Sequence, residues 1–266
     1  MKTIPLLLAF AALLPLPAQQ PAWLSEVTVA KPGPHLRIKP VQLSYQLSWN
    51  GTINSGRATF RFGLKDKRYP GSFLVQTFGH SSGVARSVFP FDFTYTSFLK
   101  GTNYRPQVFV AEEKGRDEKK NTTNRYTSKG VTSAERETDL ETKKINDSSA
   151  SFPFPQSFDL ASALLYVRSL DLKAGQEVGM VVMPFKTPYL AKVKVLAEEA
   201  HLGRDALKLG LTLQKIDKDT LKLKQYKKMK TFTLWLSNDA ERIPLEFRTK
   251  VFIGDVRGVL DSKKRF

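Results

Sequence analysis

Two strand-like runs, Thr231-Phe-Thr-Leu-Trp-Leu-Ser237 and Ile243-Pro-Leu-Glu-Phe-Arg-Thr-Lys-Val-Phe252, flank the polar segment Asn238-Asp-Ala-Glu-Arg242. Apolar and polar side chains alternate along both runs, and this period of two predicts an antiparallel hairpin. Asn238 and Asp239 favour a turn because their side chains can hydrogen-bond to nearby backbone groups. Pro244 lacks an N–H and is expected at the start of the returning strand. The stretch therefore indicates a β fold.

The same alternation recurs through the rest of the chain. It is strictest over 41–49, which ends at Trp49 and is followed by Asn50 and Gly51, the pair preferred in tight turns that need positive φ. A second strand over 57–64 is expected to pair antiparallel with the first. Further strands are predicted over 72–79, 89–99, 107–113, 177–185, 189–196, 207–214, 221–224 and 256–260.

Residues 157–170 differ from the rest because their apolar side chains follow a helical period. Asp159 can cap the helix, Gly175 ends the loop after it, and the apolar positions recur at i, i+3, i+4 and i+7, at Leu160, Ala163, Leu164 and Val167. So short a helix needs support, and we expect its stripe to lie against a sheet. The sequence thus predicts one all-β domain over 41–266, an antiparallel meander forming a half-open or closed barrel with one crossing helix.

The N-terminal segment predicts export. Residues 1–18 contain one lysine, no acidic residue and an apolar run over 4–16, which are the marks of a secretory signal peptide. The alternative is an uncleaved anchor, although the run is short for a bilayer span, and no later stretch is apolar enough to span. Residues 19–40 contain four prolines and are expected to be an extended lead-in. The mature protein is therefore expected in the periplasm, or outside the cell.

Composition narrows the choice of partners. The chain has no cysteine, so it does not rely on disulfides in an oxidising compartment. Removal of Lys2 with the leader leaves 41 basic side chains against 25 acidic ones, a net charge of +16. Lipid, lipopolysaccharide or anionic polysaccharide would complement this charge, whereas export disfavours nucleic acid; a merely solvated basic surface is the alternative. Residues 112–129 mix both charges without an apolar face and predict a mobile loop or hairpin tip, with a binding finger as the alternative.

Four local patterns resemble the bacterial domain-of-unknown-function family numbered 3108. In chain order they are Leu43-x-Tyr45-x-Leu47-x-Trp49-x-Gly51 with Gly56-Arg-Ala58, Asp159-Leu-Ala-Ser-Ala-Leu-Leu-Tyr-Val-Arg168, Leu172-Lys-Ala-Gly175, and Trp235-Leu-Ser-Asn-Asp239 with Arg242-Ile-Pro244. The resemblance covers about 41–260 and implies an exported, curved antiparallel β fold, distantly similar to periplasmic lipid carriers. It supplies no reaction, ligand or catalytic residue. The chain departs from the family in the charged segment 112–129.

Catalytic and metal motifs are weak. His35, His80 and His201 are isolated, so neither a metal site nor a cofactor is predicted. His80-Ser-Ser-Gly83 places a base beside hydroxyls, but a turn in which the hydroxyls make local hydrogen bonds is the ordinary explanation of these residues. The sequence has no Gly-x-Ser-x-Gly elbow or phosphate loop.

Several charged residues within the family-like patterns have two interpretations. Asp159 suits a helix cap and Asp239 a turn, although Asp159, Asp239 and Glu241 could also serve as general acids or bases. Arg168 could satisfy the terminal carbonyls of the helix. Alternatively, Arg168 or Arg242 could form a structural clasp with an acid such as Asp239, or hold an anionic headgroup at a barrel mouth. Together with Trp235, these two arginines are the candidate ligand-binding residues.

Three functions remain open. Aromatic strands fill a core or line a cavity for an acyl chain, and the residues concerned are Phe60, Phe62, Phe73, Phe78, Phe89, Phe91, Phe93, Trp235 and Phe247. The favoured hypothesis is a non-enzymatic envelope protein that binds an amphiphilic or anionic ligand at a curved sheet. The alternatives are a secreted hydrolase of an acidic polymer, with carboxylates at the mouth, and a scaffold that binds a protein partner.

Overall fold

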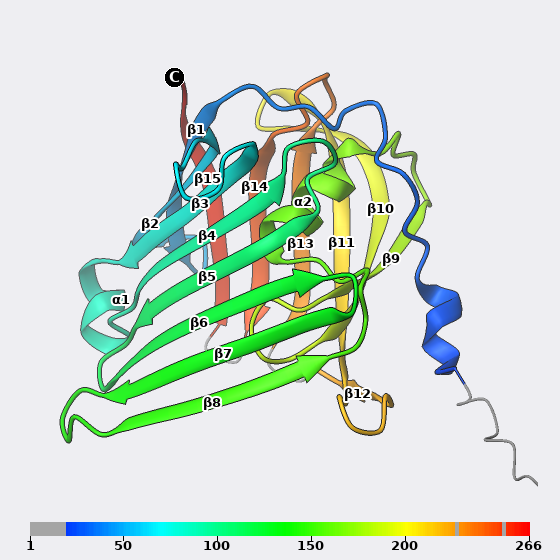
Figure 1. The fold of residues 1–266 in the computed structure, drawn as a ribbon. Helices are drawn as coiled ribbons and strands as arrows, with labels where there is room; N and C mark the ends of the chain where they lie inside the picture. Colours follow the sequence, from blue (N-terminus) through cyan, green and yellow to red (C-terminus); the bar gives the residue numbers. More distant parts are fainter. Residues whose placement is uncertain (1–19, 227–228, 252–253) are drawn as a thin grey trace, which may run out of the picture.

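The computed structural model describes residues 20–226, 229–251 and 254–266, which form one curved antiparallel sheet (Figure 1). The mainly-β prediction is confirmed, while the predicted signal peptide 1–18 lies outside the described residues. The strands are β1 (Val41–Trp49), β2 (Ile53–Leu64), β3 (Ser72–Ser81), β4 (Asp92–Lys100), β5 (Pro106–Lys114), β6 (Glu118–Thr127), β7 (Gly130–Asp139), β8 (Ile145–Phe152), β9 (Glu177–Val182), β10 (Tyr189–His201), β11 (Arg204–Ile216), β12 (Leu223–Gln225), β13 (Met229–Ser237), β14 (Pro244–Val251) and β15 (Gly254–Arg265).

The sheet is open. Its order is β8-β7-β6-β5-β4-β3-β2-β1-β15-β14-β13-β11-β10-β9, with β12 paired to β11 beside this path. The first and last strands, β1 and β15, are therefore neighbours in the middle of the sheet. Strands β8 and β9 lie at its two edges, and no ladder joins them in the described part of the chain. The half-open alternative of the predicted barrel is the one that forms.

The predicted hairpin is β13 and β14, in which Leu234 is opposite Phe247. The Asp239 carboxylate accepts hydrogen bonds from the backbone N–H groups of Glu241 at 2.9 Å and Arg242 at 3.0 Å, which fixes the turn. Pro244 is the first residue of β14, as its missing N–H requires. The turn interpretation of Asp239 is thus confirmed.

The predicted tight turn after β1 is also confirmed. Asn50 and Gly51 both have positive φ, 51° and 77°, and β1 and β2 pair antiparallel on either side of them. Trp49 closes β1, and its ring centroid lies 6.4 Å from that of Phe89. Gly175 likewise has a positive φ, 83°, in the loop before β9.

Of the two alternatives predicted for 112–129, the hairpin tip forms and the mobile loop does not: β5 pairs with β6, the turn is confined to 115–117, and most of the segment is the regular strand β6. This segment is held by contacts of its polar side chains with other segments, and not by burial of an apolar face. Lys120 lies 3.6 Å from a Glu137 carboxylate oxygen, and the buried Asn124 amide donates to the Met183 carbonyl at 2.9 Å. Hydrogen bonds and ion pairs to other segments thus allow a charged sequence to form a partly buried strand.

The predicted crossing helix is α2 (Leu160–Ser169). Asp159 caps it through a capping box: its carboxylate accepts from the Ser162 N–H at 2.7 Å, and its own N–H donates to the Ser162 hydroxyl at 2.9 Å. Two further short helices, η1 (Ala22–Glu26) and α1 (Gly83–Val88), were not predicted. Each is too short to show a helical period in the sequence.

The lead-in before β1 is extended after η1 and packs over α2 (Figure 1). The Thr28 N–H donates to the Gly179 carbonyl, and the Ala30 N–H donates to the Tyr166 hydroxyl, both at 2.9 Å. A Cβ atom on Gly179 would lie 1.8 Å from the Glu26 carbonyl oxygen. Glycine is needed there because the two backbones touch.

The seam between the two sheet edges is filled by side chains. Trp23 of η1 is buried in this seam, and its indole N–H donates to the Leu221 carbonyl at 2.7 Å. It belongs to an apolar cluster with residues from both edges, namely Val131, Phe152, Val181, Met183, Leu190 and Ile216. The seam is therefore closed mainly by side-chain packing, with one isolated parallel bridge between Phe158 and Val182.

Arg168 joins α2 to two distant segments. Its side chain is only 1% exposed and donates to the carbonyls of Leu36 at 3.0 Å, Arg37 at 3.4 Å and Glu241 at 2.6 Å. The expected clasp to the Asp239 carboxylate is wrong, since the acceptors in the described chain are backbone carbonyls. Burial lowers the pKa of Arg168 to about 10, so the group stays charged at neutral pH.

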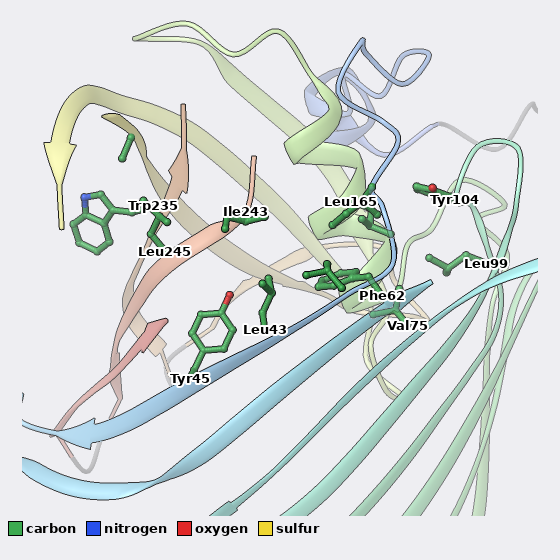
Figure 2. Close-up of a cluster of buried hydrophobic side chains, with 13 residues drawn as sticks. Leu43, Tyr45, Phe62, Val75, Leu99, Tyr104, Leu165, Trp235, Ile243 and Leu245 are labelled. Atoms are coloured by element: carbon green, nitrogen blue, oxygen red, sulfur yellow. The ribbon is translucent and has the colours of Figure 1, made fainter. Parts of the chain in front are cut away.

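The largest apolar cluster lies where α2 meets the centre of the sheet. Leu165 of α2 packs over Phe62 and Val75 of the neighbouring strands (Figure 2). Tyr45 is also buried, and its hydroxyl points toward β14, where it donates to the Pro244 carbonyl at 2.8 Å. Both halves of the chain thus share this core.

The opposite face of β13 to β15 buries a carboxylate. Glu246 is fully buried, and its oxygens accept from Arg257 at 2.7 and 2.9 Å, from His201 at 3.0 Å, and from Arg248. Burial opposes ionisation, but these hydrogen bonds outweigh it and hold the pKa of Glu246 below its ordinary value. The charged form of Glu246 is therefore built into the fold.

Replacing Arg168→Met should lower the free energy of unfolding by about 3 kcal/mol, because buried carbonyls would lose charge-assisted donors. Urea unfolding followed by circular dichroism measures the change. Arg204→Met is the matched control, since Arg204 is exposed at the start of β11, and it should change stability by less than about 0.5 kcal/mol. Equal effects of the two substitutions would show that the Arg168 hydrogen bonds to backbone carbonyls do not stabilise the fold.

Replacing Glu246→Gln should lower the free energy of unfolding by about 2 kcal/mol at neutral pH, because the charge-assisted hydrogen bonds of Glu246 would be lost. Because the folded pKa of Glu246 is depressed, its contribution is full above the unfolded value of about 4.5 and is lost as pH falls through the folded pKa. Urea unfolding of both proteins across this range should show the difference shrinking in acid. A difference that is independent of pH would refute the assignment.

Candidate functional site

The concave side of the sheet encloses an apolar cavity of about 630 Å³ that is partly open to solvent. Nearly all of its lining is apolar, and the side chains come from both halves of the sheet. Representative residues are Phe60, Phe93, Leu209, Leu211, Leu234 and Phe247. These are the inward members of the alternating strands, so the period of two creates the lining directly.

The apolar stripe of α2 faces this cavity. Leu160, Ala163, Leu164 and Val167 all contribute to its lining. The expectation that the stripe packs directly against a sheet is therefore incomplete, although Leu164 and Val167 also contact the sheet core. Because the helix crosses inside a curved sheet, space remains between its stripe and the strands.

A row of aromatic rings runs from the edge of the cavity into it. The ring centroids of Phe91 and Phe93 are 5.9 Å apart, those of Phe93 and Tyr95 4.9 Å, and those of Tyr95 and Phe185 5.7 Å. Phe93, Tyr95 and Phe185 line the cavity, whereas Phe91 is 39% exposed. The row thus links the surface to the interior.

One side of the lining carries polar groups. The Tyr95 hydroxyl donates to the Glu113 carboxylate at 2.6 Å, and Lys186 of the β9–β10 loop pairs with Glu135 of β7 at 2.8 Å. Burial raises the pKa of Glu113 and of Tyr95. Desolvation therefore favours the neutral forms of this pair, and the cavity has an apolar body with a polar edge.

The three candidate ligand-binding residues lie outside the cavity lining. Arg168 donates to the backbone carbonyls of Leu36, Arg37 and Glu241. Arg242 is 6% exposed in the β13–β14 turn, where burial lowers its pKa. Trp235 is on the opposite face of β13, stacked on His201 at 4.4 Å, with its indole N–H donating to Glu199 at 2.8 Å. Their role in ligand binding stays a prediction.

The candidate acids have structural partners. Burial raises the pKa of Asp159, and hydrogen bonds from Ser162 and Ser97 oppose this shift at the helix cap. Asp239 holds the turn, and Glu241 pairs with Lys263 and Arg265. None of these three carboxylates lines the cavity.

The histidines are dispersed, as expected. His201 binds Glu246, and the neighbour of His80, Ser81, accepts the Phe91 N–H at 2.9 Å, which is a turn role. Among the described residues, no group of three or more His, Cys, Asp or Glu is placed to hold a metal ion.

Sequence reasoning identified the aromatic strands as a possible lining but did not find Leu209, Leu211 or the Tyr95–Glu113 pair. Leucine alternation over 207–213 and the row Phe91, Phe93, Tyr95 were visible signals. Which face they line depends on curvature, which the pattern does not contain. Within the described ranges, no helix has the length and apolar character needed to cross a bilayer.

One solved structure agrees with this architecture. A structure of a β-barrel-like protein of the domain of unknown function DUF1849 from Brucella abortus has 10% identity and a TM-score of 0.53, covering 86% of this chain and 99% of that one. A protein with a YmcC-like fold from Bacteroides fragilis has 7% identity and a TM-score of 0.34, covering 89% of this chain and 100% of its own. No curated protein matches the chain.

The first of these likenesses supports the fold alone. The family model "Protein of unknown function (DUF3108)" matches residues 44–261, which is most of the chain and nearly the range expected from the four sequence patterns. The chain therefore belongs to the DUF3108 family.

Proposed function

We propose that this protein is an exported, non-enzymatic cell-envelope protein that binds the apolar chain of an amphiphilic lipid in its concave cavity. The observation that carries the proposal is the cavity of about 630 Å³, apolar and partly open. Protein interiors are normally close-packed, with few voids larger than a water molecule. A space of this size lies within the range of about 300–1,000 Å³ that is typical of ligand pockets.

The chemistry of the lining favours an acyl chain over a polysaccharide. Burial of an acyl chain against aromatic and aliphatic side chains removes apolar surface from water and so favours binding. Sugar hydroxyls would lose their hydrogen bonds to water in the same apolar cavity, which disfavours binding. The edge formed by Tyr95 and Glu113 offers a donor and acceptors for a polar end group. A molecule with one apolar and one polar end matches both parts of the cavity.

A bulky side chain on the helix should block ligand uptake. In Ala163→Trp the indole would occupy the cavity from α2, and the affinity for a fluorescent long-chain fatty acid should fall at least tenfold. Fluorescence titration of delipidated mature protein measures this affinity. Native mass spectrometry of the undelipidated protein should show an amphiphile that co-purifies.

The matched control is Ala200→Trp, at an exposed position of β10. It should leave the affinity unchanged, and circular dichroism should show that both variants fold. Absence of probe uptake by the folded wild-type protein, or equal weakening by both substitutions, would rule out the cavity as the binding site.

A further inference from the structure

An exposed apolar surface lies beside the cavity, at the start of β2 and around α1. Large apolar side chains are rarely clustered on a soluble surface unless they contact something. Half of the ten large apolar residues exposed in the described chain lie here. We call this surface the rim tip: Ile53 (42% exposed), Val84 (65%), Val88 (50%), Phe89 (44%) and Phe91 (39%).

The rim tip is held in place by polar bonds beneath it. Arg86 makes two hydrogen bonds to Asp92, at 2.8 and 3.0 Å, and Arg116 donates to the Ser87 carbonyl at 2.5 Å. The Ser82 N–H donates to the Ser55 carbonyl at 2.9 Å, which ties α1 to β2. The apolar side chains therefore stay exposed while their backbone is anchored.

Basic side chains lie directly behind the rim tip. The strand registers align Arg57 with His80, His80 with Asp92, Asp92 with Lys114, and Lys114 with Lys119, across β2 to β6. Lys114 and Lys119 are exposed, like Arg86 and Arg116. Apolar side chains at the tip would contact the acyl chains of a bilayer, and the basic side chains behind them would contact its anionic headgroups.

The rim tip also adjoins the cavity. Phe91 belongs to it and contacts Phe93, which lines the cavity. In Figure 1, α1 lies at the far end of β2 and β3 from the lead-in that packs over α2. A chain leaving a bilayer at the tip would therefore meet the aromatic row without crossing water.

We propose that the rim tip inserts into the surface of an anionic phospholipid bilayer, with the exposed basic side chains of Lys114, Arg116 and Lys119 against the lipid phosphates. This inference rests on the proposed function, since the bilayer is the source or destination of the amphiphile. A membrane fits better than a protein partner because aliphatic and aromatic side chains project together from a short anchored helix, beside cations that a phosphate surface would neutralise.

Co-sedimentation with extruded vesicles tests the docking. Mature wild-type protein should bind phosphatidylglycerol-containing vesicles at least tenfold more tightly than pure phosphatidylcholine vesicles, and added salt should weaken the binding. Val84→Asn/Val88→Asn should reduce binding to the anionic vesicles at least tenfold, because it removes apolar contact without changing charge. Lys114→Glu/Lys119→Glu should have an effect of similar size.

Matched controls lie away from the rim tip. Leu196→Asn/Leu202→Asn changes two exposed leucines of β10 and its turn, and Lys31→Glu/Lys39→Glu changes two exposed lysines of the lead-in. Both should stay within twofold of wild type. The proposal would be overturned if wild-type protein did not bind anionic vesicles. It would also be overturned if the control variants weakened binding as much as the tip variants.

Fatty-acid uptake in solution, without vesicles, separates the two proposals. Tip variants that lose vesicle binding but keep probe uptake would support docking. Wild-type protein that takes up the probe but does not bind vesicles would refute docking and leave the cavity function standing. Vesicle binding without probe uptake would support docking by this surface and refute the cavity function.

Discussion

The structure depends on the hydrogen bonds by which Arg168 holds α2 inside the curved sheet. A ten-residue helix is not stable by itself, and its apolar stripe faces a cavity that contributes little packing. The charged guanidinium compensates by joining the helix to the lead-in and to the β13–β14 turn. The capping box at Asp159 secures the other end of the helix. With both ends fixed, the stripe can face the cavity, while Leu164 and Val167 also pack against the sheet core.

The open sheet makes that cavity possible. A fully hydrogen-bonded barrel would fix the spacing of all strands, whereas here β8 and β9 remain unpaired with each other in the described chain. The seam is closed by Trp23 and its apolar neighbours, and by polar contacts such as Asn124 to the Met183 carbonyl. Packing of this kind closes the side of the sheet and leaves its concave interior unfilled.

Polarity is divided between the faces of the same strands. On β13 and β14, Leu234 and Phe247 face the cavity, while Trp235 and Glu246 face away. The outward carboxylate of Glu246 gathers two arginines and a histidine, so part of the high positive charge stabilises the fold. At the rim tip the basic residues instead surround exposed valines and phenylalanines. Basic residues thus stabilise the fold around Glu246, whereas at the rim tip they are placed to contact an anionic membrane.

The sequence alone determined most of the strands, the turns at Asn50-Gly51 and Asn238–Arg242, the cap at Asp159 and the family, because these depend on neighbours a few residues apart. Tertiary structure decided the rest. Residues 118–127 form a strand because Asn124 and Lys120 contact residues of other segments. Arg168 donates to backbone carbonyls and not to the Asp239 carboxylate. The cavity, too, arose only when curvature separated α2 from the strands. These outcomes depend on distances between segments remote in the chain, and local periodicity carries no information about such distances.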